Sequence, residues 1–304
     1  MNAPRLLLFD TASLYFRAFH GLPESLTGVD DQPVNAVRGL LDFLARFIDQ
    51  YSPTQVACCW DEDWRPAWRV ELIESYKAHR VADGTAEEVP EALARQVPLI
   101  REALNALGLP VVGRAGYEAD DIITTLTVRA RIPVDVVTGD RDLFQVVDDA
   151  GPIRVLYVAR GVARHERVDQ EWLQAKYGIT GAQYVDFAVL RGDPSDGLPG
   201  VRGIGEKTAA RLLQRYGSLA RVLAHGDELT PAVARALADA ADYIAVAPRV
   251  VAGATDADLG DPDLSLGSAP ARPEAFAELA ERLRLGGAAD RIVAALATAP
   301  DRGR

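Results

Sequence analysis

Carboxylates follow several apolar runs of this sequence, at the points where buried strands are expected to end. They are Asp10, Asp61, Asp140 and Asp142, which follow the runs at 6–9, 55–60 and 134–138. A single Asp after a strand is most often a turn or helix-cap residue. Because the carboxyl ends of parallel strands meet at one edge of a sheet, their repetition predicts a functional group of acids there.

Two further groups of acids lie in a helix start and in a turn. Glu118, Asp120 and Asp121 share one turn of an expected helix, where acids also suit the helix dipole. Asp193 and Asp196 are three residues apart in the turn GDPSDG. The candidate site therefore has nine acids, and the structural alternative is a scattered, solvated acidic surface. The nine are Asp10, Asp61, Glu118, Asp120, Asp121, Asp140, Asp142, Asp193 and Asp196.

Nine carboxylates in one place repel one another, so they require cations or raised pKa values. The set contains no His or Cys, which argues against zinc, whereas Mg²⁺ and Mn²⁺ prefer carboxylate and water oxygens. Two such ions about 3.5–4 Å apart activate water and stabilise the leaving oxygen in phosphodiester hydrolysis. The acids therefore predict a centre for two or more Mg²⁺ or Mn²⁺ ions that cleaves a phosphodiester.

The elements that must position these acids alternate between strands and helices in the first half of the chain. Short apolar runs predict buried parallel strands, and apolar residues at three- and four-residue steps predict helices. The strands are expected at 6–9, 55–60, 134–138 and 153–158, and the helices at 33–50 and 91–107. This order predicts an α/β fold with a mainly parallel sheet flanked by helices.

After about residue 160, helical segments follow one another with glycine-rich turns between them. They are expected at 170–177, 182–191, 206–216, 218–224 and 274–285. We therefore expect a metal-binding α/β core over residues 1–165 and a mainly helical region over residues 166–304, which ends in helices.

One segment of the helical half carries the cations that an anionic ligand needs. The net charge of the chain is −11, which has the wrong sign for coating nucleic acid. Residues 197–225 nevertheless hold five Lys or Arg and the single acid Glu206. Their glycines permit a tight turn that exposes amides to a DNA phosphate, although a plain helix-connecting turn is the alternative. The turn fails the phosphate-loop pattern because Glu206 separates its last glycine from Lys207.

Aromatic and basic residues alternate from residue 64 to residue 80, directly after Asp61. Cations beside stacking faces suit a single strand or a frayed end of DNA. Acids within the same segment cancel its charge, so an ordinary surface helix is the alternative.

Cys58 and Cys59 are neighbours in an apolar run, so we expect buried thiols and no disulfide between distant segments. No run of about 18 apolar residues occurs, so we expect neither a signal peptide nor a membrane span. The sequence therefore predicts a cytoplasmic protein.

Five ordered segments of the chain resemble the 5′ nuclease superfamily, and most closely the bacterial 5′–3′ exonuclease and flap endonuclease domain that precedes DNA polymerase I. They are LLLFD at 6–10, YKAHR at 76–80, GYEADD at 116–121, TGDRDLFQ at 138–145 and GDPSDGLPGVRGIGEKTA at 192–209. The resemblance implies a twisted PIN/5′-nuclease-like sheet, a helical arch over about 62–90 and a helix-hairpin-helix (helix-three-turn-helix) over about 183–225.

The same resemblance implies a two-metal enzyme that cuts 5′ flaps and nicked or gapped duplexes and trims 5′ ends, in Okazaki-fragment processing and DNA repair. The first metal group would be Asp10, Asp61, Glu118 and Asp120. The second would be Asp121, Asp140, Asp142, Asp193 and Asp196. Because all nine acids are present, we expect catalysis, with a single-strand ribonuclease or a non-catalytic branched-DNA-binding protein as the alternatives.

The resemblance also implies which residues meet DNA. Lys77 and Arg80 match the arch cations that touch the scissile phosphate, beside the aromatic Tyr76, and Arg69 belongs to the same basic segment. The hairpin would bind duplex backbone, and its carbonyls can bind K⁺ in the family; its residues are Gly200, Arg202, Gly203, Gly205, Lys207, Thr208 and Arg211. We expect a monomer whose partner is branched or nicked DNA, and association with a DNA polymerase or ligase is left open.

The sequence departs from the family at two positions. Thr11 stands where the family has Gly after the first Asp, and Gly197 stands where it has Asn. Gly197 is expected to loosen the turn that carries Asp193 and Asp196. Because no polymerase sequence follows residue 304, we expect a stand-alone enzyme.

Overall fold

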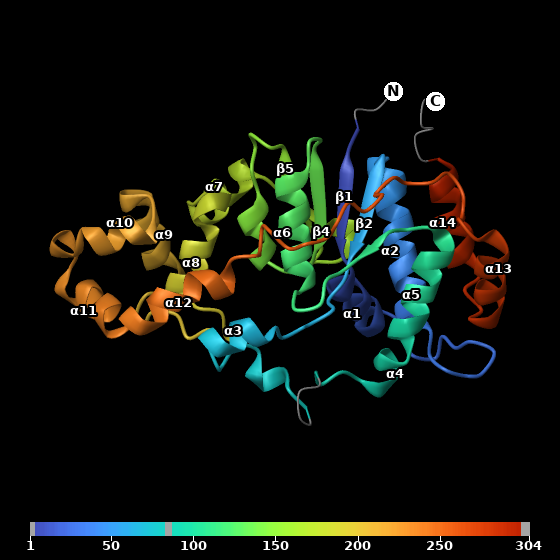
Figure 1. The fold of residues 1–304 in the computed structure, drawn as a ribbon, viewed down its shortest axis with the longest axis horizontal. Helices are drawn as coiled ribbons and strands as arrows, with labels where there is room; N and C mark the ends of the chain where they lie inside the picture. The colour runs from blue at the N-terminus through green and yellow to red at the C-terminus, as the bar shows by residue number, and fades with distance from the viewer. Residues whose placement is uncertain (1–3, 83–86, 299–304) are drawn as a thin grey trace.

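A six-stranded sheet lies at the centre of the molecule in a computed structural model that describes residues 4–82 and 87–298 (Figure 1). In the order β3-β2-β1-β4-β5-β6 all neighbours are parallel except β5 and β6. The strands are β1 (Leu6–Asp10), β2 (Gln55–Cys59), β3 (Val111–Val112), β4 (Val134–Thr138), β5 (Ile153–Tyr157) and β6 (Glu166–Val168). The predicted mainly parallel sheet is confirmed. The short strands β3 and β6 were not predicted, because two or three residues show no readable period.

The central strands are continuous apolar runs because both faces of the sheet are covered. In β1, Leu6 and Leu8 pack into one apolar cluster, whereas Leu7 and Phe9 pack into the other. Successive side chains of a strand point to opposite faces, so a strand buried on both faces needs apolar residues at every position.

One face of the sheet is covered by helices from both ends of the chain (Figure 1). They are α1 (Thr11–Gly21), α2 (Asn35–Tyr51), α4 (Glu91–Ala94), α5 (Gln96–Leu107), α13 (Pro273–Arg282) and α14 (Gly287–Ala297). The single helix predicted over 91–107 is two helices, α4 and α5. Pro98 has no amide proton to continue a helix, and it lies in the first turn of α5, where none is needed.

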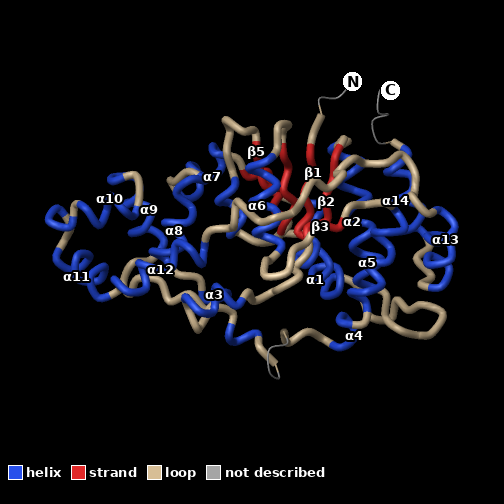
Figure 2. Tube along the Cα trace, in the orientation of Figure 1, coloured by secondary structure: helices blue, strands red, loops and turns tan. Residues whose placement is uncertain are grey.

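The opposite face is covered by α6 (Ala119–Arg129), and residues 170–251 extend away from the sheet as a helical region (Figure 2). Its helices are α7 (Gln170–Tyr177), α8 (Tyr184–Arg191), α9 (Glu206–Tyr216), α10 (Leu219–Ala224), α11 (Pro231–Asp239) and α12 (Ala241–Val251). The predicted helical character of this region is confirmed, and α11 and α12 were not predicted. The C-terminal helices α13 and α14, expected to belong to the mainly helical region over residues 166–304, pack against the α/β core instead. Within the described residues, no helix combines the length and hydropathy that a membrane span requires.

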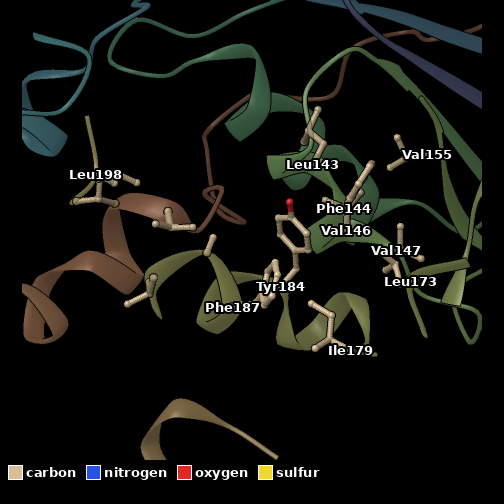
Figure 3. Close-up of a cluster of buried hydrophobic side chains, with 14 of the residues drawn as sticks. Leu143, Phe144, Val146, Val147, Val155, Leu173, Ile179, Tyr184, Phe187 and Leu198 are labelled. Atoms are coloured by element: carbon tan, nitrogen blue, oxygen red, sulfur yellow. The ribbon is translucent and has the colours of Figure 1, made fainter. Parts of the chain in front are cut away.

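Aromatic packing joins the sheet to the helical region (Figure 3). Phe144, in the 3₁₀ helix η2 (Asp142–Val146), contacts Tyr184 of α8 edge-on, with ring centroids 5.5 Å apart. It also meets Tyr157 of β5 at 5.0 Å. Burying a Phe side chain contributes about 1.5–3 kcal/mol, so this contact fixes the loop after β4 against α8.

The segment between β2 and α4 crosses the carboxyl ends of the strands (Figure 1). Its described helices are α3 (Ala67–Leu72) and the 3₁₀ helix η1 (Ala78–Arg80). Of the arch expected over about 62–90, residues 83–86 lie outside the described residues. The Ser75 hydroxyl donates to the Gly197 carbonyl at 2.7 Å, and the Lys77 amide donates to the Asp196 carbonyl at 2.9 Å. The crossing segment therefore docks on the turn of residues 193–198.

Candidate metal and nucleic-acid site

Eight of the nine predicted acids line two adjoining cavities at the carboxyl edge of the sheet. The larger is a cleft of about 810 Å³, lined by Asp10, Asp61, Glu118, Asp120, Asp140 and Asp193. The smaller, of about 10 Å³, adds Asp142 and Asp196 and shares Glu118 and Asp120 with the cleft. The strand ends and turns thus bring these acids together, as their positions in the sequence predicted.

Asp10 and Asp61 are oriented by the ends of neighbouring elements. Asp10 ends β1 and caps α1: its carboxylate accepts from the Ser13 amide at 3.2 Å and from the Thr138 hydroxyl of β4 at 2.6 Å. Asp61 accepts from the Ala119 amide at the start of α6, at 2.6 Å. The two side chains therefore serve as local caps while they line the cleft.

Removal from water is the main cause of raised pKa values among these acids. It raises the pKa of Asp10 to about 7 and that of Asp61 to about 6. It also raises the pKa values of Asp120 and Asp142 well above the ordinary range, and the nearby Asp140 carboxylate adds to both shifts. Their charged forms therefore lack compensation in the protein itself.

This donor set fits a hard divalent cation. The Asp142 Oδ1 atom is buried and has no hydrogen-bond partner among the described residues. Oxygen ligands without His or Cys favour Mg²⁺ or Mn²⁺ over zinc. Among the residues described, no three His, Cys, Asp or Glu side chains already have the geometry of an ion site. Lys or Arg side chains form ion pairs with four of the nine carboxylates, which are Glu118, Asp121, Asp193 and Asp196.

Asp121 and Arg69 differ from the sequence expectation. Asp121 is fully buried, and its two oxygens accept from the Arg69 guanidinium at 2.8 and 2.7 Å. The structure therefore does not support Asp121 as a member of the second metal group. Arg69, expected to bind DNA, is 2% exposed and faces the interior. Neighbouring residues of a helix point about 100° apart, so Asp120 lines the cleft while Asp121 points away from it.

Tyr76 is also buried rather than presented to DNA. It is 4% exposed, and its hydroxyl donates to the Glu118 carboxylate at 2.7 Å. An alternation of aromatic and basic residues reads the same in sequence whether it faces solvent or forms a buried network. Here Glu118 and Asp121, at the start of α6, bond Arg69 and Tyr76, so this part of the segment is a buried network.

Lys77 and Arg80 line the cleft as expected, each paired with an acid of the candidate site. The Lys77 ammonium donates to Glu118, and Arg80 donates to Asp196 at 2.9 Å. Burial alone would lower the pKa of Lys77, but the Glu118 carboxylate raises it well above its ordinary value. Lys77 is therefore a fixed positive charge in the cleft.

Gly197 tightens the contact with the turn of residues 193–198 instead of loosening that turn. Its φ is +70°, and a Cβ there would lie 2.0 Å from the Ser75 carbonyl oxygen. The turn itself is closed by Asp193 and Leu198, whose backbones exchange hydrogen bonds of 3.0 and 2.8 Å. The glycine thus permits the crossing segment to approach the turn closely.

The hairpin before α9 and the first two turns of α9 present their cations to solvent. Gly200 and Gly203 have positive φ values of +65° and +86°, as the tight turn requires, whereas Gly205 has an ordinary φ of −90°. Thr208 is half-buried in the first turn of α9, and the exposed basic residues are Arg202, Lys207 and Arg211. The helix-hairpin-helix residues thus form a surface separate from the cleft.

Sequence reasoning missed two cations of the cleft, Arg17 and Arg141. The Arg17 Nε atom is buried and unpartnered within the described part of the chain. Arg141 lies 3.9 Å from the Asp193 carboxylate. Arg17 follows Asp10 by seven residues, or two helical turns, so helical spacing from the first acid would have pointed to it.

Comparisons with known proteins agree with this fold. Residues 5–178 match the family described as 5′-3′ exonuclease, N-terminal resolvase-like domain, and residues 179–270 match the 5′-3′ exonuclease, C-terminal SAM fold. A 5′-3′ exonuclease of Streptomyces coelicolor is 54% identical over 95% of this chain and 99% of its own length. A 5′-3′ exonuclease of Mycobacterium tuberculosis is 48% identical over 99% of this chain and all of its own.

A solved structure of bacteriophage T5 D15 flap endonuclease, in a pseudo-enzyme-product complex with DNA and metal ions, has a similar fold. The TM-score is 0.62 at 17% identity, and the match covers 96% of this chain and 99% of the phage chain. At this identity the likeness establishes a common fold.

Proposed function

The chain belongs to the 5′-3′ exonuclease family, and on that premise we propose that this hydrolase is a structure-specific 5′–3′ exonuclease and flap endonuclease that cleaves DNA with two divalent metal ions. The observation that carries the proposal is the cleft, where acids with raised pKa values lie beside Lys77 and Arg80. Okazaki-fragment processing and DNA repair are the processes in which a nuclease with this specificity acts.

The acids divide between two metal positions. Asp10, Asp61, Glu118 and Asp120 would hold one ion, and Asp140, Asp142, Asp193 and Asp196 the other. When bound, two Mg²⁺ or Mn²⁺ ions supply an activated water and balance the charge on the oxygens of the reacting phosphodiester. Asp121 is left out because it lines neither cavity, whereas Glu118 lines both.

The cations of the cleft bind and orient the phosphate in this proposal. Lys77 and Arg80 place fixed positive charge where charge develops on the phosphate, which stabilises the transition state. Arg17 and Arg141 line the same cleft and would hold the adjoining backbone. The unpartnered Arg17 Nε atom supports that role, because a buried donor needs an acceptor.

The helix-hairpin-helix would bind the duplex DNA beside the cleavage site. The exposed cations Arg202, Lys207 and Arg211 would pair with DNA phosphates, and the carbonyl oxygens of the turn would bind K⁺. The T5 complex with DNA and metal ions supports a DNA partner for this fold. We further propose a cytoplasmic monomer.

The test is cleavage of a 5′-flap duplex, labelled at either end, with Mg²⁺, Mn²⁺ or EDTA. The wild-type protein should cut at the flap junction only when a metal is added, and Asp120→Ala or Asp142→Ala should abolish the cut. Asp42→Asn is a matched control, because Asp42 lies on α2 and pairs with Arg291 away from the cleft. Undiminished cleavage by Asp120→Ala contradicts the site. Preferential cutting of a matched RNA flap indicates a ribonuclease, and binding without product indicates a non-catalytic protein.

A further inference from the structure

The guanidinium of Arg69 joins three segments of the molecule in its interior. Its Nη1 atom donates to Glu118 at 2.6 Å and to Asp121 at 2.8 Å, and Nη2 donates to Asp121 at 2.7 Å. Nε donates to the Val250 carbonyl at 3.0 Å, and Nη2 reaches the Ala252 carbonyl at 3.4 Å. One side chain of α3 therefore bonds both the first turn of α6 and the end of α12.

The end of α12 and the chain that follows it, residues 250–257, form the return segment by which the helical region comes back to the core. It lies along α6 and bonds polar side chains of that helix. The Ala254 amide donates to Asp121 at 2.8 Å. The Thr125 hydroxyl donates to the Ala254 carbonyl at 2.9 Å and accepts from the Ala257 amide at 3.3 Å. Asp121 and Thr125 are one turn apart, so a single polar face of α6 holds the return segment.

The same first turn of α6 carries an acid of the proposed metal site. In the sequence, Asp120 lies between Glu118 and Asp121, the two acids that Arg69 bonds, and it lines both cavities. Its carboxylate has no hydrogen bond of its own to a described side chain, so its direction is set by the backbone of that turn. A rotation of the turn would therefore move Asp120 relative to the cleft.

We propose that Arg69 is a positioning residue of the nuclease reaction: it fixes the first turn of α6, and with it Asp120, against the return segment. The inference rests on the proposed function, and it gives Arg69 no contact with DNA. Its bidentate bond to Asp121 and its bonds to two backbone carbonyls need the planar fork of a guanidinium. Lysine would keep the charge and lose this geometry, so Arg69→Lys separates position from charge.

The test compares Arg69→Lys with wild type in the full chain, at a temperature where circular dichroism shows both to be folded. We expect kcat on a 5′-flap duplex to fall about 10- to 100-fold, because small displacements at a reacting centre have effects of this size. KM for the flap, and its Kd in Ca²⁺, should stay within about threefold of wild type. Amide hydrogen exchange should become faster in the return segment, at Ala254 first.

Two further variants keep the test decisive. Thr125→Val leaves Arg69 and every carboxylate in place but removes a hydroxyl that holds the return segment, so kcat should fall by a smaller factor, about 3- to 10-fold. Arg291→Lys alters an exposed bidentate pair with Asp42, whose bonds are 2.8 and 3.1 Å, on the far side of the sheet. It should leave kcat and the exchange of the return segment unchanged.

Several outcomes would overturn the positioning role. One is wild-type kcat in folded Arg69→Lys. Another is a raised KM with unchanged kcat, which would return Arg69 to a DNA-contact role. If Arg69→Lys does not fold, Thr125→Val decides, and wild-type kcat in that variant rejects the inference. A wild-type protein that does not cut the flap refutes the proposed function instead, while the exchange comparison still reports whether Arg69 holds the return segment.

Discussion

Two basic segments of this chain have similar side chains and opposite environments. In residues 64–80, Arg69, Lys77 and Arg80 each bond a carboxylate of the candidate site. In residues 200–211, the exposed cations form no ion pair with any acid that the structure describes. The first segment is therefore part of the site's internal charge balance, whereas the second is free to meet an external anion.

The difference assigns separate tasks to the two segments. Under the proposed function, Lys77 and Arg80 inside the cleft would act on the reacting phosphate and should govern kcat. Exposed cations release counterions when they meet a nucleic acid, so they should govern affinity and its dependence on salt. Substitutions in the two segments should accordingly change different measured quantities.

The largest effect is expected from Lys77→Met in the first segment. Loss of one fixed charge at the reacting phosphate should lower kcat on a 5′-flap duplex by about 10²–10³-fold. Kd for the same duplex in Ca²⁺ should change little, because the exposed hairpin is intact. Rapid-quench single-turnover kinetics measures the fall in the rate of cleavage, and fluorescence anisotropy measures Kd. If Kd rises by the same factor as kcat falls, Lys77 contributes to binding, and the proposed separation of catalysis and binding between the two segments is wrong.

A smaller effect on turnover is expected from substitution of the hairpin cations together, Arg202→Ala, Lys207→Ala and Arg211→Ala. Each phosphate contact contributes about 0.9 to the slope of log K against log salt, so the slope should fall by about 2–3. Binding should weaken, and kcat at saturating DNA should stay near wild type. Titrations from low to high KCl measure the slope. An unchanged slope would show that the hairpin does not contact phosphates.

The sequence was sufficient to predict the elements with long or regular apolar patterns. The strand at 134–138 and the helices at 170–177 and 206–216 form with the expected bounds. The helices α11, α12 and α14 were not predicted. The gathering of acids was predictable because parallel topology alone brings strand ends to one edge.

The partners of those acids were not predictable from the sequence. Asp120 and Asp121 are adjacent, yet one lines the cleft and the other bonds Arg69 and a backbone amide more than 130 residues away. Such a network depends on where the return segment lies, and no local pattern encodes that. The buried state of Arg69 follows from the same long-range contact.

An intermediate effect on stability is expected at Gly197, where the first segment meets the turn of residues 193–198. Gly197→Ala places a Cβ 2.0 Å from the Ser75 carbonyl in a backbone with φ of +70°. Overpacking and positive φ together should lower the free energy of unfolding by about 1–3 kcal/mol. Denaturant unfolding measures it, with Gly226→Ala as control, since a Cβ there meets nothing within 4 Å. Equal stabilities for the two variants would contradict the close approach.

The smallest effect is expected from Arg291→Met, which removes an Arg–Asp pair with the same chemistry as Arg69–Asp121 but in solvent. The Arg291 side chain is 59% exposed, and exposed pairs contribute about 0–1 kcal/mol to the free energy of unfolding. Arg69→Met would leave the buried Asp121 carboxylate without an ion-pair partner, a change that costs about 3–5 kcal/mol. Urea unfolding of both variants compares the pairs directly. Similar losses of unfolding free energy in the two variants would mean that burial does not make the Arg69–Asp121 pair stronger than the exposed pair. The contrast between the buried first segment and exposed cations would then have no support from stability.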